Sequence, residues 1–325
     1  MTRRRIPDDV LAAAHARATA RAAGDWAEAD RLRAEIEAAG WKIADRGTDF
    51  GLSPAAPADI DEGGRLRYGS SKSVPSRLDI EPDGPATVVL IATDWPGDVA
   101  RALAGLRAGA PPGTSLVIVA DGPSDEQAAA LDALETEFAA LPEPAAEIVW
   151  TSERLGHASA LNVGVRRASG SIVVLLDASI ELNGDVVTPL IAALDDPSVA
   201  VAGALGIVSA DLRTFETAAP GDVDAIEGYL QAFRRADYAE RGPLDERFSF
   251  YRNLDIWWSL VLRDEGEGSP PRRALSVPDL PMVRHAHRGY MSVSDDERDR
   301  QSKRNFYRII DRFGWRRDLL VGDRA

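Results

Sequence analysis

Apolar and polar positions alternate in blocks from residue 84 onward. Short apolar runs of strand length are separated by segments in which apolar residues recur at helical spacing. The predicted strands are Val88–Ala92, Ser115–Ala120, Glu147–Trp150 and Ile172–Leu176. The predicted helices are Asp98–Leu106, Asp125–Ala139 and Ala158–Ala168. Strands that alternate with helices predict an α/β fold in which helices flank a sheet.

The first 83 residues follow a different pattern. Residues 7–40 predict a helical hairpin, in which Pro7 suits a helix start and Asp25 caps a second helix. Trp41–Ala44 and Thr48–Leu52 predict a small β-hairpin, so residues 1–52 form one module. Residues 53–83 are rich in Pro, Gly, Ser and charges, which is typical of a linker, and residues 84–325 form the main domain.

Composition narrows the class of protein. The chain has 325 residues, 45% of them apolar, no cysteine and a net charge of −14. Those values predict a globular protein with a large core, without disulfides, in a reducing cytoplasm. An acidic body argues against nucleic acid as a partner but is compatible with a cation that bridges to an anionic ligand. We see no apolar run of membrane-spanning length and no signal peptide, while peripheral attachment to the inner membrane face stays open.

Carboxylates follow three of the four predicted strands. The first strand continues into Thr93 and Asp94, the second into Asp121–Asp125, and the fourth into Asp177–Ser179. Ligands of parallel sheets bind beyond the carboxyl ends of the strands. A single carboxylate there is often only a helix cap, but three together predict a binding site at this edge.

This ordered series resembles the family 2 glycosyltransferases, which have the GT-A fold. The resemblance covers about 230 residues and includes Ala160, Asn162 and Gly164 of an Ala-x-Asn-x-Gly segment. It implies a mixed sheet flanked by helices that binds a nucleoside-diphosphate sugar. It also implies that Thr93, Asp94, Asp121 and Asn162 lie at the donor nucleotide.

The family's metal-binding Asp-x-Asp motif stands here as Asp177-Ala178-Ser179. The resemblance therefore implies Mg²⁺ or Mn²⁺ held by Asp177 and Ser179, with Glu181 as a substitute for the missing second carboxylate. A hard cation with oxygen ligands would stabilise the leaving diphosphate. His287, or His285 beside it, is implied as a late metal ligand, and Arg288 as a phosphate contact.

The family's Glu-Asp-x-Asp motif, whose first Asp is the usual base, corresponds to Arg252-Asn253-Leu254-Asp255. Asn253 cannot take a proton. Asp255 is the nearest candidate base, although a helix cap or a structural ion pair explains it equally well. Asp245 and Glu246 are weaker alternatives. Trp257 and Trp258 fit the core, or one ring faces an acceptor.

Two charged segments admit more than one interpretation. The predicted helix Asp295–Phe313 is rich in Arg and Lys, which fits a solvated face, closure over the donor diphosphate, or contact with anionic lipid. Residues 18–49 resemble the C-terminal tail of cysteinyl-tRNA synthetases. We interpret them as a docking module or a homodimer element, because the piece has no net positive charge for tRNA and no catalytic part.

The leading hypothesis is therefore a glycosyltransferase that moves a hexose-type sugar from a nucleoside-diphosphate donor to a hydroxyl acceptor. The resemblance implies inversion at the anomeric carbon, while a retaining mechanism needs no separate base. The alternative is a nucleotide-sugar binding or scaffold protein that kept the fold, which Ser179 and Asn253 favour. A tRNA-linked factor is the third hypothesis.

Overall fold

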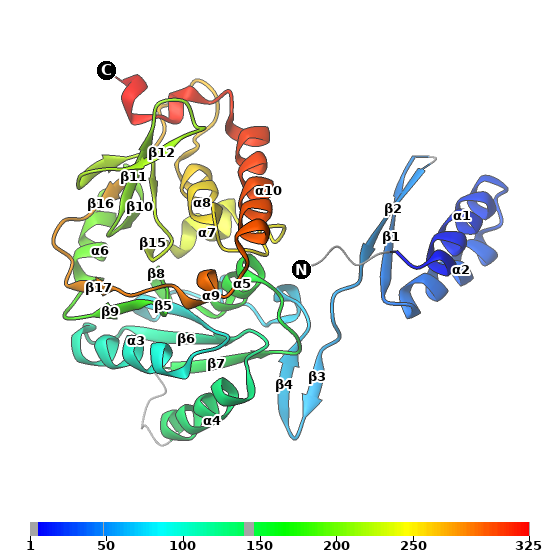
Figure 1. Ribbon diagram of the computed structural model, residues 1–325, viewed down its shortest axis with the longest axis horizontal. Coiled ribbons are helices and arrows are strands. Elements are labelled where there is room, and N and C mark those ends of the chain that lie inside the picture. Colours follow the sequence, from blue (N-terminus) through cyan, green and yellow to red (C-terminus); the bar gives the residue numbers. More distant parts are fainter. Residues whose placement is uncertain (1–5, 48, 140–145, 325) are drawn as a thin grey trace. The chain divides into compact units, whose positions relative to one another are not determined.

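The computed structural model describes residues 6–47, 49–139 and 146–324. The chain divides into a small unit, residues 1–58, and a large unit, residues 59–325 (Figure 1). Among the described residues, no helix has both the length and the apolar character needed to span a membrane.

The small unit is the predicted helical hairpin followed by a β-hairpin. Helices α1 (Asp8–Ala22) and α2 (Trp26–Ala38) precede strands β1 (Trp41–Arg46) and β2 (Asp49–Pro54). The Asp25 side chain accepts the backbone N–H of Glu28, which confirms the cap on α2. Ala14, Ile36 and Trp41 form the centre of a small apolar core. Thr48, predicted to begin the second strand, lies outside the described residues.

A ten-stranded mixed sheet forms the centre of the large unit. Its order is β13-β16-β10-β15-β8-β5-β6-β7-β4-β3. The central strands β8, β5, β6 and β7 run parallel, whereas β15 is antiparallel to both β8 and β10. The strands are β3 (Ile60–Glu62), β4 (Arg65–Tyr68), β5 (Gly84–Ala92), β6 (Ser115–Ala120), β7 (Ala146–Thr151), β8 (Gly170–Leu176), β10 (Val199–Gly203), β13 (Gly221–Val223), β15 (Leu230–Arg234) and β16 (Arg273–Ser276). The four central strands confirm the four predicted ones.

Helices cover both faces of this sheet because its strands are apolar on both sides. Val88 and Leu90 of β5 pack into one core, and Val89 between them packs into the other. The first core includes α3 (Pro96–Gly109), α4 (Asp125–Ala139) and α6 (Val187–Leu194); the second includes α5 (His157–Arg167) and α8 (Leu254–Arg263). Trp257 and Trp258 are buried in the second core, as the core interpretation of this pair predicts.

The structure differs from the expected linker at residues 60–68. Strand β4 pairs in parallel with β7, and β3 pairs with β4 at the edge of the sheet. These strands carry charges at positions where a buried strand would carry apolar residues. Arg65 and Arg67 instead place their guanidinium groups over the Trp150 ring, 4.4 and 5.1 Å from its centroid. Composition alone therefore indicated a linker where residues 60–68 form the two edge strands of the large sheet.

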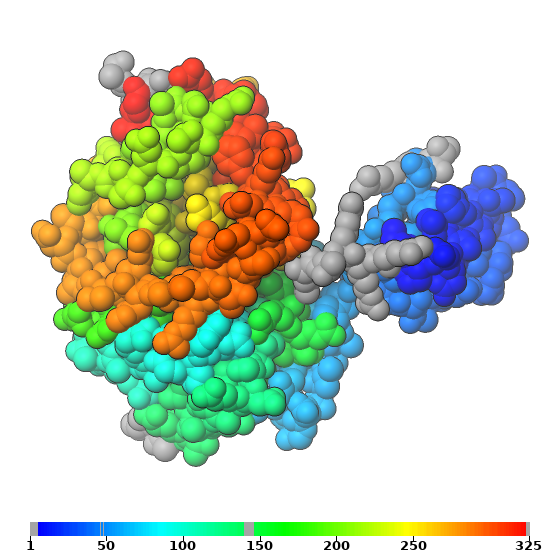
Figure 2. All heavy atoms as spheres, in the orientation of Figure 1, coloured from blue at the N-terminus to red at the C-terminus, as the bar shows by residue number. Residues whose placement is uncertain are grey.

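The remaining elements are short sheets, helices and turns outside this large sheet. A three-stranded sheet has the order β12 (Phe215–Thr217), β11 (Gly206–Ser209), β14 (Ala225–Ile226), and β17 (Met282–Arg284) pairs with β9 (Ile180–Leu182). Helix α7 (Arg235–Arg241) follows β15, and α9 (Arg288–Met291) precedes α10 (Asp295–Phe313). The short 3-10 turns are η1 (Ser71–Ser73), η2 (Arg317–Leu319) and η3 (Val321–Arg324). Figure 2 shows the orange segment near residues 280–300 lying across the face of the large unit.

Candidate active site

The carboxyl ends of β8, β5 and β6 lie side by side, because these strands are neighbours in the sheet. Asp177 follows β8, Thr93 and Asp94 follow β5, and Asp121 follows β6. The structure therefore brings the three predicted strand ends to one edge. The environments of these carboxylates differ from one another.

Asp177 faces His287, with His287 Nε2 3.1 Å from Asp177 Oδ2. The other carboxylate oxygen accepts the backbone N–H and the hydroxyl of Ser179. His287 Nδ1 accepts the backbone N–H of Tyr290, which leaves Nε2 to point at Asp177. Burial opposes the charged form of Asp177, but His287 and Ser179 outweigh it and lower the pKa of the carboxyl. Burial likewise opposes charge on His287, yet Asp177 raises the pKa of the imidazole.

These two side chains bind each other. His287 Nδ1 accepts the N–H of Tyr290, so the proton of the neutral ring is on Nε2, 3.1 Å from Asp177 Oδ2. The Asp177 carboxylate suits a divalent cation as it stands, whereas His287 would join it through Nε2 only once the ring proton moves to Nδ1 and the Tyr290 contact is released. Among the described residues, no group of three or more His, Cys, Asp or Glu side chains could hold a metal ion. Magnesium sites that recruit substrate phosphates and water need only one or two protein ligands.

Aromatic side chains enclose the Asp177–His287 pair. The Tyr251 ring stacks on His287 with 4.5 Å between centroids, and His157 meets Tyr251 edge-on at 6.0 Å. Burial lowers the pKa of His157 to about 4, so this imidazole stays neutral near pH 7. These groups and Asp255 line one cavity of about 50 Å³. Neither Tyr251 nor His157 received a role from the sequence, although His157 begins the helix after the third predicted strand.

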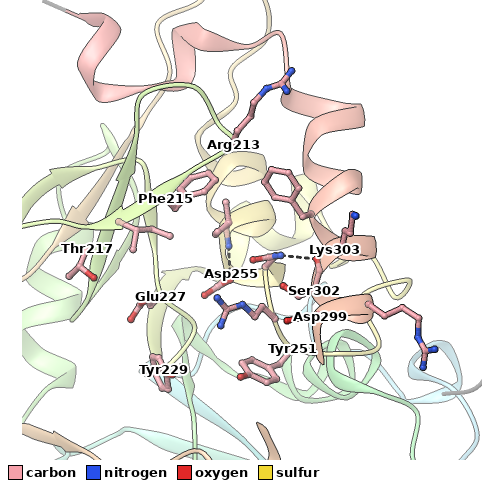
Figure 3. A pocket seen from close by; sticks show the side chains of 16 residues that line it. Arg213, Phe215, Thr217, Glu227, Tyr229, Tyr251, Asp255, Asp299, Ser302 and Lys303 are labelled. Carbon is pink, nitrogen blue, oxygen red and sulfur yellow. Dashed lines mark hydrogen bonds between the residues drawn. The ribbon is translucent and has the colours of Figure 1, made fainter. Parts of the chain in front are cut away.

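Asp255 lies between this small cavity and a larger pocket of about 710 Å³, since it lines both (Figure 3). Its two carboxylate oxygens accept the backbone N–H groups of Gly228 and Ile256. Burial raises the pKa of Asp255, and these two N–H groups oppose the rise. Glu227 also lines the larger pocket, and its pKa is raised by burial and by the charge of Asp255.

Asn253, at the position of the family's usual base, has a structural role. Its backbone is left-handed, with φ of 68°, a conformation that Asn tolerates better than most residues. Its side-chain amide donates to the carbonyl of Ser302 on α10, 3.1 Å away. Asn253 thus joins the start of α8 to α10 and also lines the larger pocket, whereas Asp255 lines both cavities.

Asp245 and Glu246, the weaker candidates for a base, have protein partners. Asp245 forms an ion pair with Arg247, which holds the pKa of this carboxyl low against its partial burial. Glu246 accepts from the Asn162 amide and from the Ser71 hydroxyl. Neither residue is among those that line the two cavities around Asp255.

Asn162 differs from the expected nucleotide contact. Its amide nitrogen donates to the Leu244 carbonyl and to Glu246. Its amide oxygen accepts from the Leu244 N–H and the Tyr238 hydroxyl, and the side chain is fully buried. Both donors and both acceptors of the amide are therefore used by the protein. Asn162 holds the loop before α8 against α5 and has no group left for a ligand.

Asp121 holds a loop in the same way. Its carboxylate accepts the backbone N–H groups of Leu155 at 2.7 Å and Gly156 at 3.3 Å. Burial raises the pKa of Asp121 to about 6. Arg154 of the same loop donates to Asp94 at 3.1 Å and to the Gly122 carbonyl. The ends of β5 and β6 are thus bridged by the loop that leads into α5.

The other charged candidates are also paired. Arg288 lies 3.4 Å from the buried carboxylate of Asp98, and its side chain is half exposed beside His287. Nε2 of His285 lies 2.7 Å from Glu181, so these two residues bind each other. Of the two late histidines, only His287 contacts Asp177.

Comparisons with known proteins bear on the fold and on the reaction class. Residues 87–241, just under half of the chain, match the model of a family described as glycosyl transferase family 2. A comparison with curated proteins found no match. The crystal structure of GalNAc-T7 with UDP, GalNAc and Mn²⁺ has a TM-score of 0.56 and 16% identity, over 70% of this chain and 47% of that one.

A second structure is the mannosyltransferase PcManGT from Pyrobaculum calidifontis in complex with GDP-Man and Mn²⁺. It has a TM-score of 0.51 and 22% identity, over 74% of this chain and 67% of that one. This chain spans about half the length of the GalNAc-T7 chain. At these identities the likeness establishes the fold, and the large unit has the GT-A fold of these glycosyltransferases.

Proposed function

We propose that the protein is a glycosyltransferase that moves a sugar from a nucleoside-diphosphate donor to a hydroxyl acceptor. The observation that carries the proposal is the Asp177–His287 pair at the end of β8, which shares one cavity with Asp255. The match to glycosyl transferase family 2 supports the same reaction class. The site thus combines Asp177 and His287, as candidate ligands of a cation, with the Asp255 carboxylate, which also lines a second, larger pocket.

Asp177 and His287 would hold Mg²⁺ or Mn²⁺, and Ser179 would orient the Asp177 carboxylate through its hydroxyl and N–H. The cation supplies charge stabilisation for the departing diphosphate when it is bound. Arg288 begins α9 directly after His287 and would contact a phosphate oxygen with its exposed guanidinium.

Thr93, Asp94 and Asp121 would define the nucleotide end of the donor site. Because Asp121 and Asp94 bind the loop at residues 154–156, we assign them the task of shaping this end. The neutral His157 and the stacked Tyr251 would keep water from the reacting centre, since they close the small cavity.

Asp255 would remove the proton of the acceptor hydroxyl. Its raised pKa makes this carboxylate a stronger base than an exposed one, which favours a general base. Because Asp255 faces the larger pocket, the acceptor hydroxyl would attack from that side of the donor sugar, which predicts inversion at the anomeric carbon. The anomeric configuration of an isolated product distinguishes inversion from retention.

The test is metal-dependent cleavage of a nucleotide sugar. The protein is incubated with the common sugars of UDP, GDP and dTDP, with and without Mn²⁺, and released nucleoside diphosphate is quantified. We expect release from one donor class that depends on Mn²⁺ and is abolished in Asp177→Asn. No release from any donor would contradict the proposal and favour a nucleotide-sugar binding or scaffold protein.

A further inference from the structure

The larger pocket is built from two separate parts of the chain. One wall comes from the β11–β12 region and includes Arg213 and Phe215, and the opposite wall is formed by α10 with Lys303 and Phe306. Figure 3 shows Arg213 at the β11–β12 end of the pocket and Lys303 on the α10 side. Asp255 stands at the bottom, where the pocket meets the small cavity. A molecule in this pocket would therefore present its hydroxyl to Asp255.

Three cations that line this pocket, Arg213, Arg252 and Lys303, form no ion pair among the described residues. The charge of Arg252 nevertheless opposes the rise in the pKa of Asp255 and Glu227, and its guanidinium lies over the Tyr290 ring. By contrast, Arg300 on the same rim is paired with Glu297, and Arg284 is paired with Glu227. Asp299 is the one acidic rim residue that α10 adds among the described lining residues. The described lining includes four cations, Arg213, Arg252, Arg300 and Lys303, and three carboxylates, Glu227, Asp255 and Asp299. In a chain of net charge −14, a concave site with an excess of positive charge favours an anion.

The backbone that carries these cations is held in place before any ligand binds. Asp211 accepts the N–H groups of Arg213 and Thr214, which fixes the turn at one end of the pocket. The buried Asn305 amide donates to the carbonyl of Arg252. Asn253 adds its bond to Ser302, so the floor and the α10 wall are joined. The cations therefore project from a preformed frame, which lowers the ordering cost of binding.

We propose that the acceptor is a hydroxyl compound that also carries an anionic group, a phosphate or a carboxylate, which Arg213, Arg252 and Lys303 bind. The inference rests on the proposed function, because it assigns this pocket to the acceptor of that reaction. Phe215 and Phe306 add apolar surface for the uncharged body of the same molecule. The anion fixes the orientation in which the hydroxyl meets Asp255.

The first experiment measures anion binding and needs no knowledge of the natural acceptor. The full chain is saturated with the nucleoside diphosphate it binds and Mg²⁺, which fills the diphosphate site. Glycerol 1-phosphate, glycerate and glycerol are then titrated by calorimetry at low ionic strength, where exposed charges are least screened. We expect binding of the phosphate or the carboxylate compound and none of glycerol.

Substitutions assign the binding to this pocket. Lys303→Gln and Arg252→Gln should each weaken anion binding about tenfold, the effect of losing one charge-assisted hydrogen bond. The matched control Arg300→Gln removes a charge of the same rim that is paired with Glu297, and it should leave the affinity within about twofold. All three side chains are exposed, so the fold should persist.

The outcomes separate this inference from the proposed function. Absence of anion binding to the wild type, or equal binding by wild type, Lys303→Gln and Arg252→Gln, would overturn the inference. Failure of every nucleoside diphosphate to bind would refute the proposed function, and the anion titration without nucleotide would still report on the pocket. Comparing glycerol 1-phosphate with glycerate decides between the two anionic groups.

Discussion

Asp121, which is buried, and Asp255, which is half-buried, are two carboxylates of the candidate site, and each has a raised pKa. Asp121 binds two backbone N–H groups of the loop that leads into α5, and nearby Asn162 has all of its amide groups bound. Asp255 also accepts two N–H groups but lines two cavities, and the charge of Arg252 acts on it.

The difference separates residues that build the site from residues that face it. On the nucleotide side, motif positions such as Asp121 and Asn162 use their polar atoms to hold loops. On the pocket side, Asp255 and Arg252 keep groups directed at open space. Substitutions should therefore damage stability on the first side and turnover on the second.

The largest expected effect is on turnover, from Asp255→Asn. The amide cannot take the acceptor proton, so turnover should fall about 10²- to 10⁴-fold while nucleotide affinity is retained. The measurement is the initial rate of nucleoside diphosphate release, with nucleotide affinity measured in parallel.

Asp245→Asn is the matched control for that substitution. Asp245 is bound to Arg247 and lines neither cavity, so its loss should change the rate by only a few fold. If Asp245→Asn reduced turnover as much as Asp255→Asn, the assignment of the base would be refuted.

Asn162→Ala should lower the free energy of unfolding by about 3 kcal/mol, because it leaves buried groups of Tyr238 and Leu244 without partners. Nucleotide affinity, measured well below the unfolding temperature, should change little. Urea unfolding of both proteins checks the first value. A stable variant that had lost nucleotide binding would show that Asn162 contacts the donor after all.

Asp121 should leave a signature in the dependence of stability on pH. Its pKa is about 6 in the folded protein against 3.8 ordinarily, so between these values the folded state holds the extra proton. Its contribution to stability is therefore present below pH 4 and is lost as the pH rises to 6. The difference in unfolding free energy between wild type and Asp121→Asn should show this slope. A flat difference between pH 4 and pH 6 would contradict it.

The smallest expected effect comes from Asn253→Asp, which restores the family's carboxylate. The carboxylate cannot donate to the Ser302 carbonyl, so stability should fall by about 1 kcal/mol. Because this side chain is directed at α10, turnover should not rise. A clear gain in turnover would mean that a carboxylate at position 253, which also lines the larger pocket, takes the acceptor's proton, and the assignment of Asp255 as the base would be refuted.

Much of the fold follows from pattern. The central strands β5 to β8 were predictable because buried parallel strands are continuous apolar runs, and the Asp25 cap because its spacing to Glu28 is local. The edge strands β3 and β4 were not predictable, since their Arg residues are stabilised by Trp150, a residue distant in sequence. A local pattern carries no information about such a partner.

The candidate site was predictable only in part, for the same reason. The sequence indicated Asp177, His287 and Asp255 as candidates, and the structure brings all three around one cavity. The sequence did not indicate that the Asn162 and Asp121 side chains bind loops. Their partners, at Leu244 and Leu155, are distant in the chain, and no local pattern connects them. Glu227 lies in no motif, and Arg252 lies in the altered Glu-Asp-x-Asp segment without an assigned role, so only the fold shows that both line the pocket of Asp255.

The central claim is that Asp177 and His287 hold a cation for a nucleoside diphosphate, and thermal stability tests it most directly. The unfolding temperature is measured with UDP, GDP and dTDP and their sugars, with and without Mn²⁺, for wild type, Asp177→Asn and the control Asp245→Asn. A ligand that binds the native state raises its stability. We predict a rise with one nucleotide that requires Mn²⁺, is kept in Asp245→Asn and is lost in Asp177→Asn. An equal rise in Asp177→Asn, or no rise with any nucleotide at millimolar concentration, would contradict the claim.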